Sequence, residues 1–337
     1  MIEIQNITKN YRLADGSALP VLNGLSLRVQ RGEIAAVVGP SGAGKSTLAK
    51  CISLHERPDS GEILVNGQDL SRLRGSELRA ARRAIGTVFQ SSALLQRKTA
   101  WQNVALPLEY LGVVPHQIKE RVETLLDDVG LSHKAQRYPA QLSGGERQRI
   151  GIARALALHP TVLLADEATS GLDPATTEST LELLKRLRDE YQLAIVLITH
   201  EMDAVRRAAD TVAEIDGGKI VSATPLAQLL AQPESALAQR LLPTPQAESY
   251  QGLALRVAYR DAVPVDWISR LTRQWQLHID LLGGHIETVN GRPAGRLTIG
   301  VRFEGRSLGL PQLVAAFNAL GLAVETLNTA PAWQEAV

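Results

Sequence analysis

The feature that most constrains this chain is a glycine-rich run, Gly39-Pro40-Ser41-Gly42-Ala43-Gly44-Lys45-Ser46-Thr47. An apolar stretch at 34–38 suits a buried strand, and 48–52 reads as the first turns of a helix. Glycines between a strand and a helix let backbone N–H groups curl around an anion, and the helix N-terminus adds partial positive charge. The run therefore predicts a loop that binds a nucleoside triphosphate, with Lys45 reaching the β- and γ-phosphates and the Ser46 hydroxyl able to ligate Mg²⁺. A strand-to-helix turn without a ligand is the alternative.

Composition excludes several classes of protein. At 337 residues the chain has room for two domains, and 45% hydrophobic with 21% charged residues is typical of a globular chain. The net charge of +1 gives no electrostatic reason to expect a nucleic-acid partner. The single Cys51 rules out an internal disulfide and favours a reducing compartment. No apolar run approaches the roughly 20 residues of a membrane span, and residues 1–6 lack signal-peptide regions, so we expect a cytosolic chain that can dock on a membrane protein.

The first half of the chain predicts an antiparallel layer and then a helical region. Residues 2–7 and 25–29 alternate apolar and polar, and 62–65 end at the turn pair Asn66-Gly67, so these three strands should form a small antiparallel sheet beside the loop. From 76 to 158 the signals are mostly helical, with one helix expected over 101–111 and another over 114–129. Pro107 should kink or end the first of these helices.

The next segments predict a parallel sheet with polar residues at one edge. Residues 161–165 and 193–198 read as fully buried strands with a helix over 175–191 between them, an order that implies parallel strands and crossover helices. Polar residues follow each strand: Asp166, Glu167, Thr199 and His200. Because ligands of open parallel sheets bind at the carboxyl ends of the strands, we expect these residues to share one site with the glycine-rich loop.

A second constellation precedes a helix expected over 146–158, and it reads Leu142-Ser143-Gly144-Gly145-Glu146-Arg147-Gln148. Ser143 and Glu146 fit a capping box, which needs no ligand. Asp173-Pro174 likewise fits a helix N-cap followed by proline at the first helical position. Each motif alone leaves a capping role and a functional role equally open. Their order relative to the loop and the polar strand ends favours function.

Together these motifs resemble the ATP-binding-cassette family. The resemblance covers residues 1 to about 240 and implies an α/β fold of the phosphate-loop NTPase type, with a mostly parallel sheet, an antiparallel β subdomain and a helical subdomain. It implies a homodimer that sandwiches ATP, and a groove near Gln90–Leu111 for a membrane permease. The motifs that carry it are Gly39–Ser46, Val88-Phe89-Gln90, residues 142–148, Leu163-Leu164-Ala165-Asp166-Glu167, Ser170-Gly171-Leu172-Asp173 and Ile198-Thr199-His200.

The resemblance also implies roles for the residues at the nucleotide. Ser46, Asp166 and Gln90 would organise Mg²⁺, and Gln90 would also sense the attacking water. Glu167 looks like the general base, and His200 would contact the γ-phosphate. The implied catalytic residues are Glu167, His200, Gln90 and Lys45. The implied nucleotide contacts of the loop are Gly39, Pro40, Ser41, Gly42, Ala43, Gly44, Lys45, Ser46 and Thr47.

Two further nucleotide contacts are implied outside the loop. Tyr11 is similar to the aromatic residue that stacks on adenine, although the residues alone support a packed surface aromatic equally well. The segment Ser143, Gly144, Gly145 and Glu146 would contact the γ-phosphate of ATP held by a second copy, since amides at a helix N-terminus can bind phosphate. A monomer would therefore lack half of each site.

After residue 240 the pattern changes. Residues 233–251 read as a linker, which gives a cassette over 1–241, a linker over 242–251 and a second domain over 252–337. Strands are expected at 253–259, 277–289, 296–303 and 322–327, helices at 263–275 and 310–320, and a turn at 290–293. This β-α-β-β-α-β order predicts a ferredoxin-like unit. Trp267 and Trp275 are expected in its core, and His278 and His285 lack the spacing of metal ligands.

The tail narrows the resemblance to bacterial methionine-importer ATPases. The segments that carry it are 279–287 and 295–297, with 56–58, 103–109 and 199–202 in the cassette. That family implies two permease subunits, a place for this chain at the cytoplasmic face of the inner membrane, and an extracytoplasmic methionine-binding protein, with L- and D-methionine as cargo. It also implies a tail that binds internal methionine and holds the ATPase halves apart. Two glycines permit close backbone approach, so the regulatory pocket is expected at Leu282, Gly283, Gly284, His285 and Ile286.

Several alternatives stay open. Gly283-Gly284 could be a β-bulge in a tail that only dimerises. The cassette motifs alone would also fit an importer for another amino acid or small solute, or a lipoprotein-release ATPase. A repair or translation ATPase would also share them, but such proteins usually carry two fused cassettes, coiled coils or basic insertions, which this chain lacks.

Overall fold

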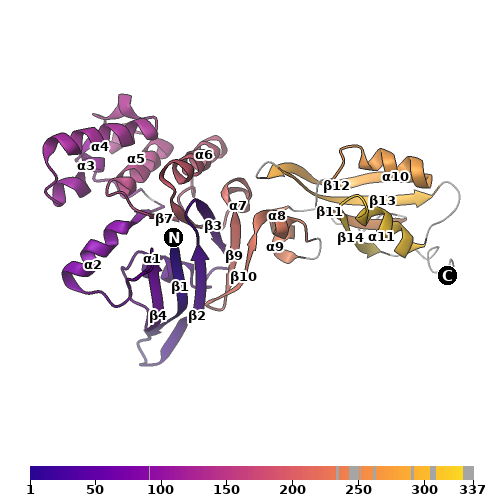
Figure 1. Cartoon of the computed structure of the whole chain (residues 1–337), viewed down its shortest axis with the longest axis horizontal. Helices are drawn as coiled ribbons and strands as arrows, with labels where there is room; N and C mark the ends of the chain where they lie inside the picture. The colour runs from indigo at the N-terminus through magenta and orange to yellow at the C-terminus, as the bar shows by residue number, and fades with distance from the viewer. Residues whose placement is uncertain are drawn as a thin grey trace. The chain divides into compact units, whose positions relative to one another are not determined.

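The computed structural model describes residues 1–90, 92–232, 235–242, 250, 252–260, 263–289, 292–303 and 309–328. Contacts divide the chain into two units, Met1–Ala223 and Thr224–Val337, which are coloured by residue number in Figure 1. The predicted boundary after residue 241 differs from this division, which assigns residues 224–241 to the second unit. Within the described part of the chain, no helix is long and apolar enough to cross a lipid bilayer.

The first unit is built on a sheet of six strands in the order β10-β9-β3-β8-β7-β6. Their bounds are β3 Glu33–Val38, β6 Ile85–Val88, β7 Val162–Asp166, β8 Ala194–Ile198, β9 Thr211–Asp216 and β10 Lys219–Pro225. The pairs β3–β8, β3–β9, β6–β7 and β7–β8 are parallel. All of β8 is buried, as its continuous apolar sequence predicts. The expected parallel sheet is thus confirmed.

A second sheet of the first unit is antiparallel and has the order β2-β1-β4-β5. The strands are β1 Ile2–Arg12, β2 Ala18–Val29, β4 Ser60–Val65 and β5 Gln68–Asp69. The predicted antiparallel layer is confirmed, but β1 and β2 extend well beyond the alternating segments. Alternation marks only the part of each strand that has one buried face, so it underestimates strand length here.

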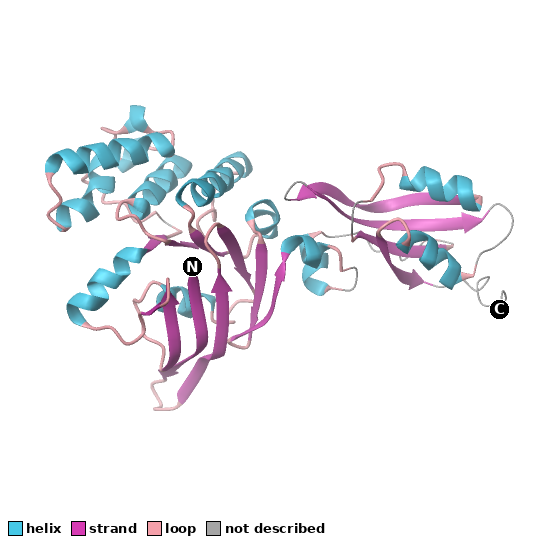
Figure 2. Ribbon diagram, viewed as in Figure 1, coloured by secondary structure: helices cyan, strands magenta, loops and turns pink. Residues whose placement is uncertain are grey.

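Helices complete the first unit, and α3, α4 and α5 gather in a helical layer of their own (Figure 2). Pro107 lies inside α3, which continues to Tyr110, so the proline does not end the helix. The segment predicted as mostly helical also contains a strand, β6. The helices are α1 Lys45–Ile52, α2 Gly75–Ala81, α3 Ala100–Tyr110, α4 Pro115–Asp128, α5 Gly144–Leu156, α6 Pro174–Tyr191 and α7 Met202–Ala208, with 3-10 turns at Arg82–Ala84, Ser132–Lys134 and Pro139–Gln141.

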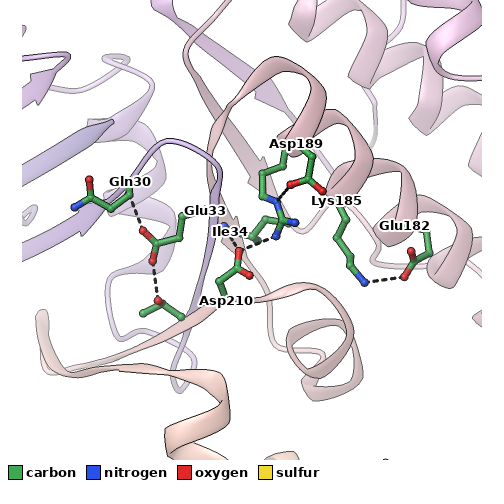
Figure 3. Close-up of polar contacts among 9 residues, drawn as sticks. Gln30, Glu33, Ile34, Glu182, Lys185, Asp189 and Asp210 are labelled. Carbon is green, nitrogen blue, oxygen red and sulfur yellow. Dashed lines mark hydrogen bonds and ion pairs between the residues drawn. The ribbon is translucent and has the colours of Figure 1, made fainter. Parts of the chain in front are cut away.

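A polar cluster holds the amino ends of the parallel strands (Figure 3). Asp210 Oδ2 accepts a hydrogen bond from the Ile34 N–H and another from Arg188 Nη1, each at 2.8 Å. Glu33 accepts hydrogen bonds from the backbone of Gln30 and from the hydroxyl of Thr211, both at 2.7 Å. These contacts join β3 to α6 and to the start of β9, at the edge of the sheet opposite the glycine-rich loop.

The second unit contains an antiparallel sheet in the order β12-β13-β11-β14, with two helices whose residues Trp267 and Phe317 meet at a ring-centroid distance of 5.9 Å. Its elements are β11 Leu253–Tyr259, α10 Trp267–Trp275, β12 Leu277–Val289, β13 Arg292–Phe303, α11 Leu310–Asn318 and β14 Leu322–Asn328. The β-α-β-β-α-β order is as predicted, and Trp275 packs against the core. Arg292 and Pro293 pair with Val289 and Thr288, so they belong to β13 and not to the predicted turn, whose other residues lie outside the described ones.

Two short helices precede this sheet, α8 Leu226–Leu230 and α9 Ala236–Leu241. The helix α9 falls in a segment read as linker from its sequence, and its buried leucines explain the difference because they give it an apolar face to pack. The side chain of Arg296 is fully buried and its Nη1 donates to the Gln232 carbonyl at 2.6 Å. Most of the predicted linker 242–251 lies outside the described residues.

Candidate active site

The glycine-rich loop connects the carboxyl end of β3 to the first residue of α1. Gly44 has φ 106° and lies against the backbone of Val21, so a side chain would be strained and crowded there. Lys45 Nζ donates to the carbonyls of Gly39 and Pro40 at 2.7 and 2.8 Å. The lysine ammonium therefore lies over the loop, where it can move from carbonyl oxygens to phosphate oxygens.

Glu167 and His200 leave the neighbouring strands β7 and β8 at the same edge of the sheet. Their side chains meet, with Glu167 Oε1 3.2 Å from His200 Nδ1. Glu167 has φ 50°, a left-handed conformation that costs energy outside glycine, and its N–H donates to the Ile198 carbonyl at 2.9 Å. The strained turn directs the carboxylate toward the histidine.

Asp166 is the last residue of β7, directly before Glu167, and Gln90 follows the neighbouring strand β6. Burial, and secondly the charge of Glu167, raises the pKa of the Asp166 carboxyl. Gln90 follows β6, and its Nε2 donates to Ser170 Oγ at 3.2 Å. The strand order places Asp166, Glu167 and His200 at the edge that holds the loop, as the strand pattern predicted. Gln90 reaches the same edge through β6, a strand that the sequence pattern did not predict.

The donor set at this edge suits magnesium. Ser46, Asp166 and Gln90 offer hydroxyl, carboxylate and amide oxygens, the hard ligands that Mg²⁺ prefers. Within the described part of the chain, no group of three or more His, Cys, Asp or Glu side chains is arranged so that it could hold a metal ion by itself.

Tyr11 is anchored beside α1 by side chains whose roles the sequence did not predict. Its hydroxyl donates to Glu56 Oε2, and Glu56 Oε1 pairs with Lys50 Nζ at 3.2 Å. Burial, followed by the Glu56 carboxylate, raises the pKa of Tyr11, and the Tyr11 hydroxyl in turn lowers the pKa of Glu56. Lys9 Nζ lies 5.8 Å from the ring centroid. The ring is thus held close to the helix that begins at the loop.

The segment 143–146 forms the amino end of α5. Ser143 Oγ accepts from the Glu146 N–H at 3.2 Å and Glu146 Oε2 accepts from the Ser143 N–H at 2.8 Å, so the predicted capping box is present. Glu146 also pairs with Lys134 at 2.9 Å. A side chain at Gly145 would overlap Thr176, which explains the glycine by close packing of α5 on α6. Ser143 and Gly144 are exposed, which leaves the helix terminus accessible to an anion.

The predicted regulatory residues lie on β12, an edge strand. The register shifts between Leu281 and Gly283, so Leu282 is the extra residue of a β-bulge. Leu281 and Ile286 are 61% and 52% exposed. His285 Nε2 lies 3.2 Å from a Glu287 carboxylate oxygen. Among the described residues, β12 pairs with β13 on one side only, and Leu281 and Ile286 add exposed apolar surface to this edge.

Comparisons with known proteins agree with this geometry. The family model described as ABC transporter matches residues 22–170. "Methionine import ATP-binding protein MetN 1" of Rhodococcus jostii (strain RHA1) is 50% identical over 100% of this chain and 99% of its own length. "Methionine import ATP-binding protein MetN" of Thermobifida fusca (strain YX) is also 50% identical, over 93% of this chain and 97% of its own length.

Solved structures resemble the cassette part of the chain. The dimeric ATP-binding cassette MJ0796, bound to ADP and Pi after hydrolysis, matches with TM-score 0.61 at 33% identity, over 67% of this chain and 99% of that one. The protein cbiO1 of Clostridium perfringens, part of the ABC transporter complex cbiONQ, matches with TM-score 0.62 at 29% identity, over 69% of this chain and 91% of that one.

The fold and the site define an ATP-binding and ATP-hydrolysing cassette of the ABC transporter class. Near-complete coverage at 50% identity narrows the class further. The chain belongs to the family of methionine import ATP-binding proteins.

Proposed function

We propose that this chain hydrolyses ATP to drive the import of methionine, as the L- and also the D-enantiomer, through a membrane permease. The observation that carries the ATPase part is the 3.2 Å pair of Glu167 and His200 beside the phosphate loop. The methionine part is supported by relatives named as methionine importers that match both units of the chain. The chain would act as a peripheral protein at the cytoplasmic face of a bacterial inner membrane, where an extracytoplasmic methionine-binding protein delivers cargo to two permease subunits.

The residues of the site account for each part of the reaction. Lys45 and the loop amides bind the phosphates, and Glu167 takes a proton from the water that attacks the γ-phosphorus. The bond from that phosphorus to the β–γ bridging oxygen breaks, which leaves ADP and inorganic phosphate. His200 holds the γ-phosphate and the carboxylate of Glu167 in place. Ser46, Asp166 and Gln90 would hold Mg²⁺, which would supply positive charge to offset the charge of the phosphates.

A homodimer would complete the site. The exposed terminus at Ser143 and Gly144 can face the γ-phosphate of ATP bound to a second copy. Because the capping box satisfies the N–H groups of Ser143 and Glu146 within the chain, part of this terminus is already paired and the remaining amides would receive the phosphate. A related cassette described as dimeric supports the arrangement.

An apolar cleft of about 500 Å³ on the first unit is the proposed docking site for the permease. Tyr110, one of its lining residues, is 83% exposed, so the cleft presents a large aromatic ring together with its other apolar side chains. An apolar floor bordered by arginines fits a short amphipathic helix. The lining residues are Arg79, Arg82, Arg83, Leu106, Pro107, Tyr110, Leu111 and Leu158.

The substitution Glu167→Gln tests the ATPase assignment. The variant should bind ATP, hydrolyse it at least about 100-fold more slowly because the base is lost, and accumulate as an ATP-bound dimer in light scattering. Glu178→Gln is the control, since Glu178 is exposed and pairs with Arg207 away from the loop. Turnover at the wild-type rate in Glu167→Gln would contradict the role of the base.

The second unit is proposed to bind internal methionine near Leu282–Ile286 and to hold the ATPase halves apart. Ligand that prefers separated halves must lower the population of the hydrolysing dimer. The alternative is an importer for another amino acid or small solute whose second unit only dimerises. The bulge at Leu282 and the exposed edge of β12 would also serve a unit that only dimerises, because neither feature needs a ligand.

Calorimetry on the full-length chain distinguishes a second unit that binds methionine from one that only dimerises. L-methionine should bind and inhibit ATP hydrolysis, D-methionine should also bind, and leucine should do neither. Ile286→Asp should abolish methionine binding, whereas Val265→Asp, at a fully exposed position of the same unit, should leave binding unchanged. Binding of another solute in place of methionine would establish the alternative.

A further inference from the structure

One face of α5 contacts the segment around Gln90, namely Phe89, Ser92 and Ala93. The contacts come from positions 148, 151 and 154, whose spacing of three places them on one side of the helix. Gln148 Nε2 donates to the Phe89 carbonyl at 3.2 Å. Arg154 Nη2 donates to the Ser92 carbonyl at 2.7 Å, and its Nη1 donates to the Ala93 carbonyl at 2.9 Å.

The segment that α5 contacts has an unusual backbone conformation after Gln90. Ser92 and Ala93 have φ 52° and 45°, so two consecutive residues with side chains adopt the left-handed region. L-residues rarely do so, and such backbone persists only where surrounding contacts enforce it. Gly151 lets α5 approach closely, since a Cβ there would lie 3.3 Å from Ser92 Cβ. Ser91 lies outside the described residues.

The guanidinium of Arg154 supplies the enforcing contacts. It is partly buried and donates to both strained residues, and a charged donor makes stronger hydrogen bonds than a neutral one. Lysine could not reproduce two donors at a fixed spacing. Without the guanidinium, the left-handed backbone at Ser92 and Ala93 would relax. Gln90 would then no longer be followed by a backbone of fixed conformation, and its own position would vary.

We propose that Arg154 is a positioning residue that holds Gln90 in its place at the ATP site. The proposal rests on the proposed function, in which Gln90 contacts the metal and the attacking water. It also gives α5 two roles, because Ser143, the N-cap of the same helix, is proposed to face the second ATP.

A double-mutant cycle on the full-length chain measures this role. Arg154→Met should lower kcat for ATP hydrolysis by about 10- to 100-fold with a smaller change in KM, because misplacing a reacting group costs rate more than binding. The kcat of Arg154→Lys should lie between those of the wild type and Arg154→Met. In a Gln90→Ala background, Arg154→Met should cost less than about twofold, since the group it positions is gone. Equal losses in both backgrounds would overturn the proposal.

The matched control is Arg149→Met. Arg149 lies on the same helix and donates to the Val129 carbonyl at 3.2 Å, away from Gln90. It should leave kcat unchanged, and a loss equal to that of Arg154→Met would point to general damage of α5 instead.

Hydrogen exchange gives a readout that does not need activity. Arg154→Met should speed exchange of backbone amides at 92–95, and Arg149→Met should not. Unchanged exchange at 92–95 in Arg154→Met would refute the positioning role. A wild-type chain that does not hydrolyse ATP would refute the proposed function instead, while the exchange comparison would still decide the role of Arg154.

Discussion

Thr169 donates a hydrogen bond from its hydroxyl to Glu201 Oε2 over 2.7 Å. Thr169 is 1% exposed and lies two residues after Glu167, while Glu201 follows His200. The bond therefore ties the segment that carries the proposed base to the segment that carries its histidine. It reinforces the direct 3.2 Å contact between Glu167 and His200.

Replacing Thr169 with valine should slow ATP hydrolysis by about tenfold, because the segments that position Glu167 and His200 lose their link. The change conserves shape and leaves a carboxylate without its donor. Steady-state hydrolysis and urea unfolding of the variant would measure both effects.

Thr180→Val is the matched control for that change. Thr180 is fully buried in α6, and its hydroxyl has no hydrogen-bond partner among the described residues. Valine should therefore stabilise the fold by about 1 kcal/mol and leave hydrolysis unchanged. Equal loss of activity in both variants would show that the Thr169 bond has no special role.

Two helix caps separate stability from catalysis. Ser143 caps α5 and Thr99 caps α3, each in a capping box. Replacing either with alanine should cost about 1 kcal/mol of unfolding free energy. ATP hydrolysis should fall strongly in Ser143→Ala alone, since that cap is proposed to face nucleotide. Equal activities in the two variants, measured with saturating ATP, would argue against a composite site.

Acid should remove the contribution of Glu146 to the stability of the fold. Lys134, and then the Ser143 backbone, lowers the pKa of Glu146 from its ordinary value of 4.5. A carboxyl group whose pKa is lower in the folded state than in the unfolded state stabilises the fold at pH values above its unfolded-state pKa. This stabilisation is lost as the pH falls through its folded-state pKa. Glu146→Gln should therefore be less stable than wild type at pH 7 by less than about 1 kcal/mol, and the gap should close below pH 4.5. Urea unfolding over a pH series checks this, and a gap that persists in acid would contradict it.

Asp210→Asn should lower the free energy of unfolding by about 1–3 kcal/mol. One carboxylate oxygen accepts from both Ile34 and Arg188, and an asparagine amide can offer either its oxygen or its NH₂ group at that point, but not full charge. The KM for ATP should not change, because the cluster lies at the opposite edge of the sheet. An unchanged unfolding midpoint would show that the cluster is not stabilising.

Cys51 should report unfolding of α1. It is fully buried, and burial raises the pKa of its thiol to about 11. At pH 8 iodoacetamide should modify it only after the helix opens, because the thiolate is the reactive form. ATP should slow the labelling by stabilising the folded state. Fast labelling of the native chain would contradict the burial.

Much of the site was predictable because its residues stand at fixed places in sequence order. The loop at Gly39, Asp166 with Glu167, and His200 each follow an apolar strand, and strands of a parallel sheet end at one edge. The same logic explains the second unit, where alternation marks strands with one helix-covered face. These predictions needed no knowledge of side-chain partners.

The rest depended on three-dimensional contacts. β6 was missed because Gly86 and Thr87 interrupt its apolar pattern, and Gly86 is explained by the close approach of the Ala155 carbonyl. Glu56 and Arg154 were not predicted to act, since nothing in their neighbours along the chain shows that Tyr11 or the left-handed residues after Gln90 lie beside them. Pro107 within α3 shows that a helix can tolerate a local violation once packing fixes it.

The cluster around Asp210 has a consequence for redesign. Because the contacts that fasten β3, α6 and β9 lie at the amino ends of the strands, substitutions at the carboxyl ends need not weaken them. A library that varies the nucleotide-facing side chains while keeping the far edge unchanged should retain a high fraction of folded members. Contacts at the amino ends of the strands should thus keep the fold stable while variants with new nucleotide preferences are selected.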